Sequence, residues 1–374
     1  MTHRHRFMIP LVAVSTLLPL APALGQAPER VRVADDARSF VLEPSGKPFR
    51  PIGFNYDHDA PGRLIEDYWH DEWPMVEEDF EEMKDLGANV VRVHLQFGRF
   101  MDAPDAPNAA QLDRLGDLLD LAERVGLHLD LTGLGCYHKQ DVPGWYDELS
   151  EADRWAAQAN FWKAVAGLCA GRSVVFCYDL MNEPVVPGGR REPGDWLGPG
   201  FGDKHFVQFI TLDPAGRPRP EVARGWIATL SEAIRAVDPD TLITVGLVPW
   251  SLDRPGLSSG FVPDAIADDL DFVAVHLYPE SGKVDEAIET LRGFVVGKPV
   301  VIEETFPLKS GPEDFKEFLK DAEPIASGFI GFYWGTPPDE LRPPETIGAA
   351  LLLGWLDLFR EHLAPLADGP EQTP

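Results

Sequence analysis

Short apolar runs alternate with amphipathic stretches along the chain from about residue 50 to residue 360. The runs are almost uniformly apolar, as in Val174-Val175-Phe176, which is typical of strands that are buried on both faces of a parallel sheet. The pattern predicts eight such strands. They are expected at residues 51–55, 88–95, 127–132, 174–181, 241–248, 271–278, 298–304 and 328–334.

The stretches between these runs have apolar residues at helical spacing. In the first of them Trp73, Val76, Phe80 and Met83 form one stripe, which ends at Gly87. Similar stripes follow, and we expect their aromatic side chains to lie in the core. Strands that alternate with helices predict an α/β fold. Eight strands fit a closed (β/α)8 TIM barrel, with a doubly wound open sheet as the alternative.

The barrel is expected to form a single domain. A short N-terminal hairpin over residues 31–49 precedes it, with its turn at Ser45-Gly46-Lys47-Pro48. The segment 185–220 is rich in Gly, Pro and Arg and directly follows the fourth strand, so we interpret it as a long loop of the active site and not as a linker. Neither GxGxxG nor a P-loop is present, which counts against nucleotide-binding folds.

The first 25 residues have the pattern of a secretion signal. Arg4 and Arg6 precede an apolar run, and small residues at positions 23–25 offer a cleavage site. The run is broken by Pro10 and Pro19, so we expect cleavage and a secreted protein, not a membrane anchor. The domain is then residues 26–374.

Composition limits the partners. The net charge of the whole chain is −28, and a strongly acidic surface repels the phosphates of nucleic acids. There are three cysteines and no CxxC motif, so we expect buried free thiols in place of a disulfide framework. The residues do not indicate an oligomeric state or a cofactor.

In a (β/α)8 barrel the reactive groups lie at the carboxyl ends of the strands. Several predicted strands end in polar or aromatic residues. These are Asn55 on the first strand, Arg92 and His94 on the second, Asn182 and Glu183 on the fourth, His276 and Tyr278 on the sixth, Glu303 and Glu304 on the seventh, and Trp334 on the eighth.

Two carboxylates at non-adjacent strand ends can converge over the mouth of the barrel. Glycoside hydrolysis requires one protonated carboxyl and one carboxylate, a pair that Glu183 and Glu304 could supply, and their mutual repulsion would raise one pKa. Neighbours on a strand point to opposite faces, so one of Glu303 and Glu304 is expected to face the lumen, and the pattern does not decide which. Two alternatives stay open: a metal-dependent hydrolase with Glu183, His276 and Glu304 as ligands, and a carbohydrate-binding protein without catalysis.

The run Leu180-Met181-Asn182-Glu183-Pro184 resembles the acid/base motif of glycoside hydrolase family 5, in the clan of retaining barrel hydrolases. The resemblance extends over most of residues 47–334. It includes Arg92 on the second strand, His276-Leu277-Tyr278-Pro279 on the sixth, and Lys298 to Glu304 on the seventh.

The resemblance implies a role for each matched residue. Glu183 would be the acid/base and Glu304 the nucleophile, held by Arg92 and Tyr278. Asn182 would bind the sugar 2-hydroxyl and His276 would support the acid/base. Trp334 would be the aromatic floor beneath the scissile sugar. No metal and no cofactor are implied.

Departures from the family pattern bear on the substrate. Many cellulases of the family have a His on the third strand, where this chain has Thr132. Together with the paired Glu of the seventh strand, this departure favours β-mannan slightly over β-1,4-glucan as the expected substrate. Tyr137 and Trp250, on loops after the third and fifth strands, are candidates for stacking on sugar faces.

Overall fold

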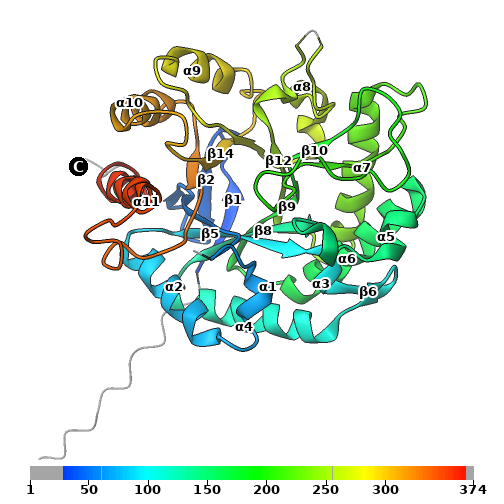
Figure 1. Cartoon of the computed structure of the whole chain (residues 1–374), viewed down its shortest axis with the longest axis horizontal. Helices are drawn as coiled ribbons and strands as arrows, with labels where there is room; N and C mark the ends of the chain where they lie inside the picture. Colours follow the sequence, from blue (N-terminus) through cyan, green and yellow to red (C-terminus); the bar gives the residue numbers. More distant parts are fainter. Residues whose placement is uncertain (1–27, 60, 255, 368–374) are drawn as a thin grey trace, which may run out of the picture.

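The computed structural model describes residues 28–59, 61–254 and 256–367 and contains a closed barrel of eight parallel strands (Figure 1). Each strand lies close to its predicted position, so the (β/α)8 fold is confirmed. In spatial order the strands are β12 (Leu242–Leu247), β13 (Val273–His276), β14 (Val300–Thr305), β15 (Gly328–Gly331), β4 (Ile52–Tyr56), β5 (Val90–Gln96), β8 (His128–Gly135) and β9 (Val175–Asn182).

Helices surround the barrel, as Figure 1 shows. The longer ones are α2 (Trp73–Asp85), α4 (Ala109–Val125), α6 (Glu151–Cys169), α7 (Arg219–Arg235), α9 (Val284–Arg292), α10 (Pro312–Ala322) and α11 (Ile347–Leu358). Short helices are α1 (Ile65–Tyr68), α3 (Phe97–Phe100), α5 (Gly144–Glu148) and α8 (Pro263–Ile266), and short turns of 3-10 or π type are η1 (Lys139–Asp141), η2 (Pro249–Ser251), η3 (Ala267–Asp269), η4 (Phe359–Leu363) and η5 (Ala364–Leu366).

The predicted apolar stripes pack inward. Phe80 of α2, Trp226 of α7 and Trp355 of α11 are fully buried against the outer faces of the strands. Helix α4 illustrates how sequence sets the ends: the Asn108 side chain accepts a hydrogen bond from the Gln111 amide, and Gly126 ends the helix with a left-handed backbone. The three cysteines are buried free thiols, as predicted.

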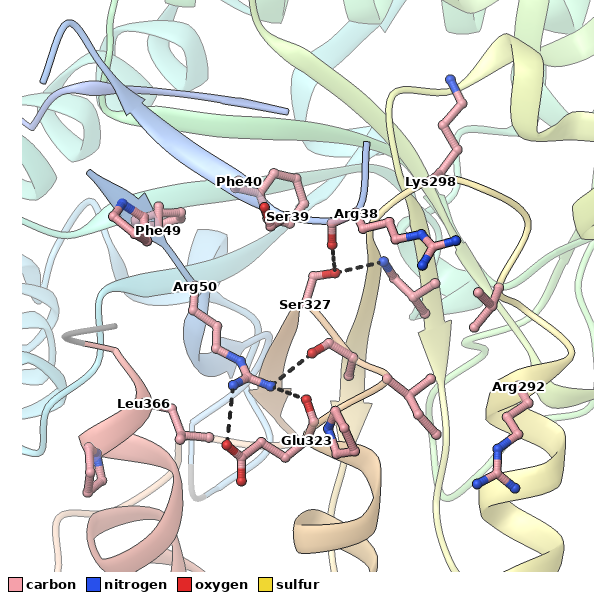
Figure 2. Close-up of a pocket in the computed structure, with 17 residues that line it drawn as sticks. Arg38, Ser39, Phe40, Phe49, Arg50, Arg292, Lys298, Glu323, Ser327 and Leu366 are labelled. Carbon is pink, nitrogen blue, oxygen red and sulfur yellow. Dashed lines mark hydrogen bonds and ion pairs between the residues drawn. The ribbon is translucent and has the colours of Figure 1, made fainter. Parts of the chain in front are cut away.

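A small antiparallel sheet covers the amino end of the barrel. It has three strands, β1 (Arg30–Val33), β2 (Phe40–Glu43) and β3 (Pro48–Phe49), so the predicted hairpin is present with one strand more. Beside it is a cavity of about 1060 Å³, shown in Figure 2. There Arg50 donates to the carbonyls of Glu323 and Ala326, which fixes the sheet to the segment that follows α10.

The segment after β9 is a long structured loop. It contains β10 (Pro184–Val185) and β11 (Gln208–Phe209), which pair in parallel. Between them the bridges Leu197–Gln208 and Phe201–Lys204 form a hairpin, called here the 197–208 hairpin. A further short pair, β6 (Met101–Ala103) and β7 (Ala106–Pro107), follows α3.

The predicted secretion signal lies outside the described residues. Among the helices of residues 28–367 that the structure places, none is long and apolar enough to span a bilayer.

Candidate active site

Glu183 and Glu304 stand at the carboxyl ends of β9 and β14. Glu183 has a φ of 49°, a left-handed backbone that is uncommon for a residue with a side chain, and its amide donates to the Gly246 carbonyl at 3.0 Å. This turn directs the Glu183 side chain toward β13, where one of its oxygens lies 3.0 Å from Nδ1 of His276. Strained backbone of this kind clusters at functional sites.

Both glutamates of the 303–304 pair point into the barrel, so the expectation that only one faces the lumen is wrong. The register of β14 shifts against β13 and against β15 near these residues, and this irregularity removes the strict alternation of faces. Glu304 reaches the mouth, whereas Glu303 is fully buried beneath it. One oxygen of Glu303 lies 3.3 Å from Nε2 of His276 and 3.4 Å from Arg92.

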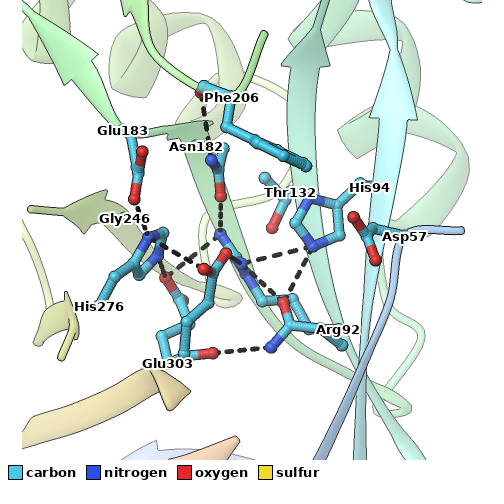
Figure 3. A network of polar contacts seen from close by, with 12 residues as sticks. Asp57, Arg92, His94, Thr132, Asn182, Glu183, Phe206, Gly246, His276 and Glu303 are labelled. Carbon is cyan, nitrogen blue, oxygen red and sulfur yellow. Dashed lines mark hydrogen bonds and ion pairs between the residues drawn. The ribbon is translucent and has the colours of Figure 1, made fainter. Parts of the chain in front are cut away.

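Arg92 is the centre of the polar network in Figure 3. Its side chain is fully buried, and one nitrogen donates to Glu304 and to Asn55, both at 2.7 Å. The other nitrogen donates to Asp179 at 2.6 Å and to Asn182 at 3.0 Å. The planar guanidinium therefore fixes groups from β4, β9 and β14 relative to one another.

Further hydrogen bonds complete the cradle around Glu304 and Asp179. The Tyr278 hydroxyl donates to the second oxygen of Glu304 at 2.6 Å. Thr132 donates to Asp179 at 2.8 Å, and so does the Gly246 amide. A side chain at Gly246 would stand 2.8 Å from Nε2 of His276, so glycine is required for this close approach.

The acidic pair is close together. One oxygen of Glu183, one oxygen of Glu304 and a ring nitrogen of His276 lie within 4.8 Å of one another. A separation of about 5–5.5 Å is typical of glycosidases that retain configuration, and about 6.5–9.5 Å of those that invert it. The spacing therefore fits the retaining class and not the inverting one.

Two buried histidines have opposite electrostatic surroundings. Burial alone would lower the pKa of His276, but Glu304, Glu183 and Glu303 outweigh it and raise the pKa to about 10. Burial and then the nearby Arg92 charge hold the pKa of His94 well below its usual value. At neutral pH His276 is thus charged and can donate to the carboxylates, while His94 is neutral and contacts the Asn55 oxygen and the Tyr137 hydroxyl.

This charge assignment gives a pH prediction. The folded pKa of His276 lies above the usual value of about 6.5, so its protonation stabilises the fold fully below pH 6.5, and that contribution is lost as the pH rises through about 10. We expect the imidazole NMR signal of His276, assigned by its loss in His276→Gln, to stay in the charged form through pH 8. A titration midpoint between pH 6 and 7 would contradict it.

A second carboxyl pair lies deeper in the barrel. Burial, and then the charge of Glu303, raise the pKa of Asp130 well above its usual value. Burial opposes the charge of Glu303, but Arg92 and His276 hold its pKa below the usual glutamate value. These opposite shifts favour a neutral Asp130 and an ionised Glu303. Burial raises the pKa of Glu304, with His276, Arg92 and the Tyr278 hydroxyl opposing.

The two catalytic candidates open into a cavity of about 470 Å³. Its walls are mostly apolar and aromatic. The residues that line it are His58, Glu183, Pro199, Phe201, Gly202, Lys204, Phe206, Val207, Tyr278, Glu304, Phe306, Leu308, Phe332 and Tyr333.

Three predicted contact residues do not line this cavity. Trp334 is fully buried, packs edge-on against Phe54 and donates to Asp79 at 2.8 Å, so it faces the helix side of the barrel and not the cavity. Tyr137 is fully buried with its hydroxyl bound to His94, because the 197–208 hairpin covers it. Trp250, in η2, also lies outside the lining.

The remaining predicted residues are brought together. Asn55, Arg92, His94, Asn182 and His276 form the buried support beneath Glu183 and Glu304, and Tyr278 reaches the cavity itself.

Other residues of the site were missed. Phe332 and Tyr333 provide the aromatic surface expected of Trp334, one and two positions earlier in the chain. His58 pairs with Asp57 at 2.7 Å and stacks on Tyr333. His58 follows the first barrel strand, and Phe332 and Tyr333 follow the eighth. These positions at strand ends were the sequence signal that could have identified them as site residues. Phe206 and Lys204 lie on the 197–208 hairpin, whose path the pattern does not reveal.

Glu183, His276 and Glu304 could in principle hold a metal ion. A ligand histidine must be neutral, and in this structure both ring nitrogens of His276 already lie within 3.5 Å of the carboxylates of Glu183, Glu303 and Glu304. Arg92 also donates directly to Glu304 and supplies the positive charge that a metal would bring. Arg92 and His276 are therefore the chain's own partners for these two carboxylates.

Comparisons with known proteins identify the family of the chain. The family model described as Cellulase (glycosyl hydrolase family 5) matches residues 42–305. No curated protein sequence matches the chain.

Solved structures share the fold at low sequence identity. An exo-β-1,4-mannosidase from Opitutaceae bacterium strain TAV5 superposes with a TM-score of 0.67 at 16% identity, over 90% of this chain and 62% of the mannosidase. This chain thus spans less than two thirds of that protein. A β-1,4-mannanase from the sea hare Aplysia kurodai gives a TM-score of 0.61 at 16% identity, over 91% of this chain and 98% of the mannanase. An endo-1,4-β-mannanase from Rhizomucor miehei gives 0.59 at 20% identity, over 89% and 99%.

Proposed function

The chain belongs to glycosyl hydrolase family 5 and is a glycosidase that hydrolyses O-glycosyl bonds, and we propose that it is a secreted retaining enzyme for β-linked polysaccharide or oligosaccharide. The observation that carries the retaining mechanism is the separation of the two carboxylates, with one oxygen of Glu183 within 4.8 Å of one of Glu304. The predicted signal at residues 1–25 supports secretion.

In the first step Glu183 donates its proton to the glycosidic oxygen. The bond between that oxygen and the anomeric carbon breaks while the Glu304 carboxylate attacks the anomeric carbon from the opposite face, which forms a covalent glycosyl-enzyme. In the second step Glu183 removes a proton from water, the water oxygen attacks the anomeric carbon, and the bond to Glu304 breaks. Both substitutions invert the centre, so the product retains its configuration.

The contacts around Glu304 support its role as the nucleophile. Arg92 and Tyr278 each donate to one of its oxygens, at 2.7 and 2.6 Å. These donors favour the ionised carboxylate against the cost of its burial. Charged His276, 3.0 Å from Glu183, orients the acid/base. The Asn182 oxygen accepts a hydrogen bond from Arg92, and we expect this side chain to bind the 2-hydroxyl of the sugar on Glu304.

We propose β-mannan and glucomannan ahead of β-1,4-glucan as substrates. Two features support this order. Thr132 occupies the third strand in place of the histidine of many family cellulases, and its hydroxyl serves Asp179. The solved structures that superpose include mannanases and a mannosidase, at 16–20% identity.

The proposal is tested with purified mature protein and four polymers: β-mannan, glucomannan, carboxymethyl cellulose and β-1,3-glucan. We expect sugar release from the mannans to exceed release from the others, and to be unaffected by a chelator such as EDTA, because the site has no need of a metal. Retention of the anomeric configuration is measured by NMR, because a retaining enzyme releases the β-anomer of the product first. Loss of activity in EDTA, or an α-anomer formed first, would overturn the mechanism, and binding without release would favour a carbohydrate-binding protein.

A further inference from the structure

The 197–208 hairpin does not stay over the strand from which it comes. The His205 amide donates to the Tyr137 carbonyl at 2.8 Å, in the loop that follows β8. The Phe206 ring packs on Tyr137 with 5.0 Å between ring centres. The Lys204 side chain is almost wholly buried, with its ammonium beside Gly62 in the loop after β4. The hairpin thus crosses the mouth of the barrel from β9, over β8, to β4.

Aromatic rings continue from the hairpin to the loop that follows the eighth strand of the barrel. The hairpin and these rings together are called here the aromatic wall. Phe206 meets Phe332 with 6.3 Å between ring centres. Phe332 in turn lies 6.1 Å from His58, which stacks on Tyr333 at 4.2 Å. The wall therefore runs without interruption from the hairpin to the loops after β15 and β4. These rings all line the cavity and border it on one side, called here the closed side.

The closed side is the side of the sugar that becomes attached to Glu304. The Asn182 amide donates to the Phe206 carbonyl at 3.2 Å, so the proposed 2-hydroxyl ligand stands directly against the hairpin. Figure 3 shows Phe206 extending from there toward His94, while Glu183 lies on the opposite side next to His276. The leaving group, which Glu183 protonates, is accordingly on the β13 side, away from the wall.

Two large apolar side chains are exposed at the rim of the cavity. Phe201 at the tip of the hairpin is 71% exposed, and Leu308 in the loop after β14 is 53% exposed. Both also line the cavity. Large exposed apolar side chains at the mouth of a polar-floored site are suited to contact the apolar faces of sugar rings. The cavity of about 470 Å³ is near the lower end of the range of about 300–1,000 Å³ for small-molecule pockets.

We propose that the hairpin and aromatic wall make this an exo-acting enzyme, which binds the non-reducing end of a β-linked chain and releases short products from it. The terminal sugars lie between Phe206, Phe332 and the catalytic pair, and the rest of the chain leaves between Phe201 and Leu308. This inference rests on the proposed function and adds the direction and position of attack.

The test follows the first products from β-1,4-mannohexaose that carries a fluorescent label at its reducing end. We expect the first labelled product to be only one or two sugars shorter than the substrate, and the viscosity of mannan to fall slowly relative to the release of reducing ends. Labelled products of all lengths at early times would overturn the proposal, and so would labelled monosaccharide as the first product.

Opening the wall should change this pattern. Gly198 and Val207 are already joined by a backbone hydrogen bond of 2.8 Å, so residues 199–206 can be replaced by Asn-Gly, a two-residue hairpin turn. We expect the share of internal cleavage to rise about tenfold, the equivalent of about 1.4 kcal/mol in relative barrier. Phe206→Ala keeps the backbone and should shift the pattern in the same direction. Val295→Ala, at the opposite end of the barrel beside the cavity of Figure 2, is the control and should not.

The outcomes separate the two proposals. If the wild type and both opened variants all cleave only near the chain end, the wall does not set the mode of attack. Cleavage of mannan without cleavage of the hexaose would also overturn the inference, because an enzyme for chain ends must accept a short chain. Failure to cleave any glycan would overturn the proposed function itself.

Discussion

Substitution of Glu304 by Gln is expected to reduce sugar release by about 10⁴-fold or more, which is the scale on which loss of a nucleophile acts in other covalent enzymes. A neutral amide cannot form the glycosyl-enzyme. Its single oxygen can still accept the hydrogen bond from Arg92, whereas its NH2 group takes the place of the oxygen that accepts from Tyr278. The measurement is kcat on the glycan that the polymer panel identifies. Residual binding of the glycan by the variant would show that the cavity is intact.

Glu303→Gln is the matched control, since it makes the same chemical change one residue earlier. Glu303 is fully buried beneath the site and has no contact with the cavity. We expect a much smaller loss of kcat, together with a loss of stability because Arg92 and His276 each lose a carboxylate partner. If the effects were reversed, with Glu304→Gln active and Glu303→Gln inactive, the nucleophile would have to be reassigned to Glu303.

Glu183→Ala should be distinguished from both by the leaving group. An acid that protonates the departing oxygen contributes about 10²–10⁴-fold for a poor leaving group, and little for an activated aryl glycoside that departs as a stable anion. We therefore expect a large loss on oligosaccharide and a small one on the first turnover of an activated aryl glycoside. Equal losses on both substrates would remove Glu183 from the role of acid.

The barrel was readable from the sequence because its strands and helices differ in the length and period of their apolar residues. Strand ends could also be located, and this placed Glu183, Glu304, Asn182 and His276 at one end of the fold. What the sequence could not give was the exact facing of residues at strand irregularities. Glu303 entered the barrel because the register shifts there.

The same limit explains the aromatic residues. Phe332, Tyr333 and Trp334 are consecutive, and the alternation of side chains along a strand does not decide which of them faces the cavity. Trp334 points outward, where its ring nitrogen donates to Asp79 and its ring packs against Phe54. The 197–208 hairpin is a long-range effect: its position depends on contacts with Tyr137 and Phe332 that local sequence does not encode.

The network around Arg92 gives the largest expected effect on stability. Arg92 is fully buried and contacts the carboxylates of Asp179, Glu303 and Glu304, which come from two other strands of the barrel. Removing one partner of a buried ion pair costs about 3–5 kcal/mol, because the remaining charge is left without compensation in a medium of low dielectric constant. In this network three acids would be left to share His276 as their nearby cation.

Arg92→Met is therefore expected to lower the free energy of unfolding by about 3–5 kcal/mol at neutral pH, measured by chemical denaturation. Arg92→Lys retains the charge but not the planar fork that reaches both β9 and β14, so it should fall between Met and wild type. Arg172 is a surface counterpart, paired with Asp120 and Glu123 and part-exposed, and Arg172→Met should cost about 1 kcal/mol or less.

A pH series separates the charge effect from simple loss of packing. In Arg92→Met the acids lose the cation that favours their ionised forms, so their pKa values rise and acid protonates them more readily. The deficit relative to wild type should then shrink as the pH falls from 7 toward 4, because protonated carboxyls no longer need a partner. A deficit that is the same at both pH values would assign the cost to packing alone, and a loss below about 1 kcal/mol at pH 7 would mean that Arg92 does not hold the network together.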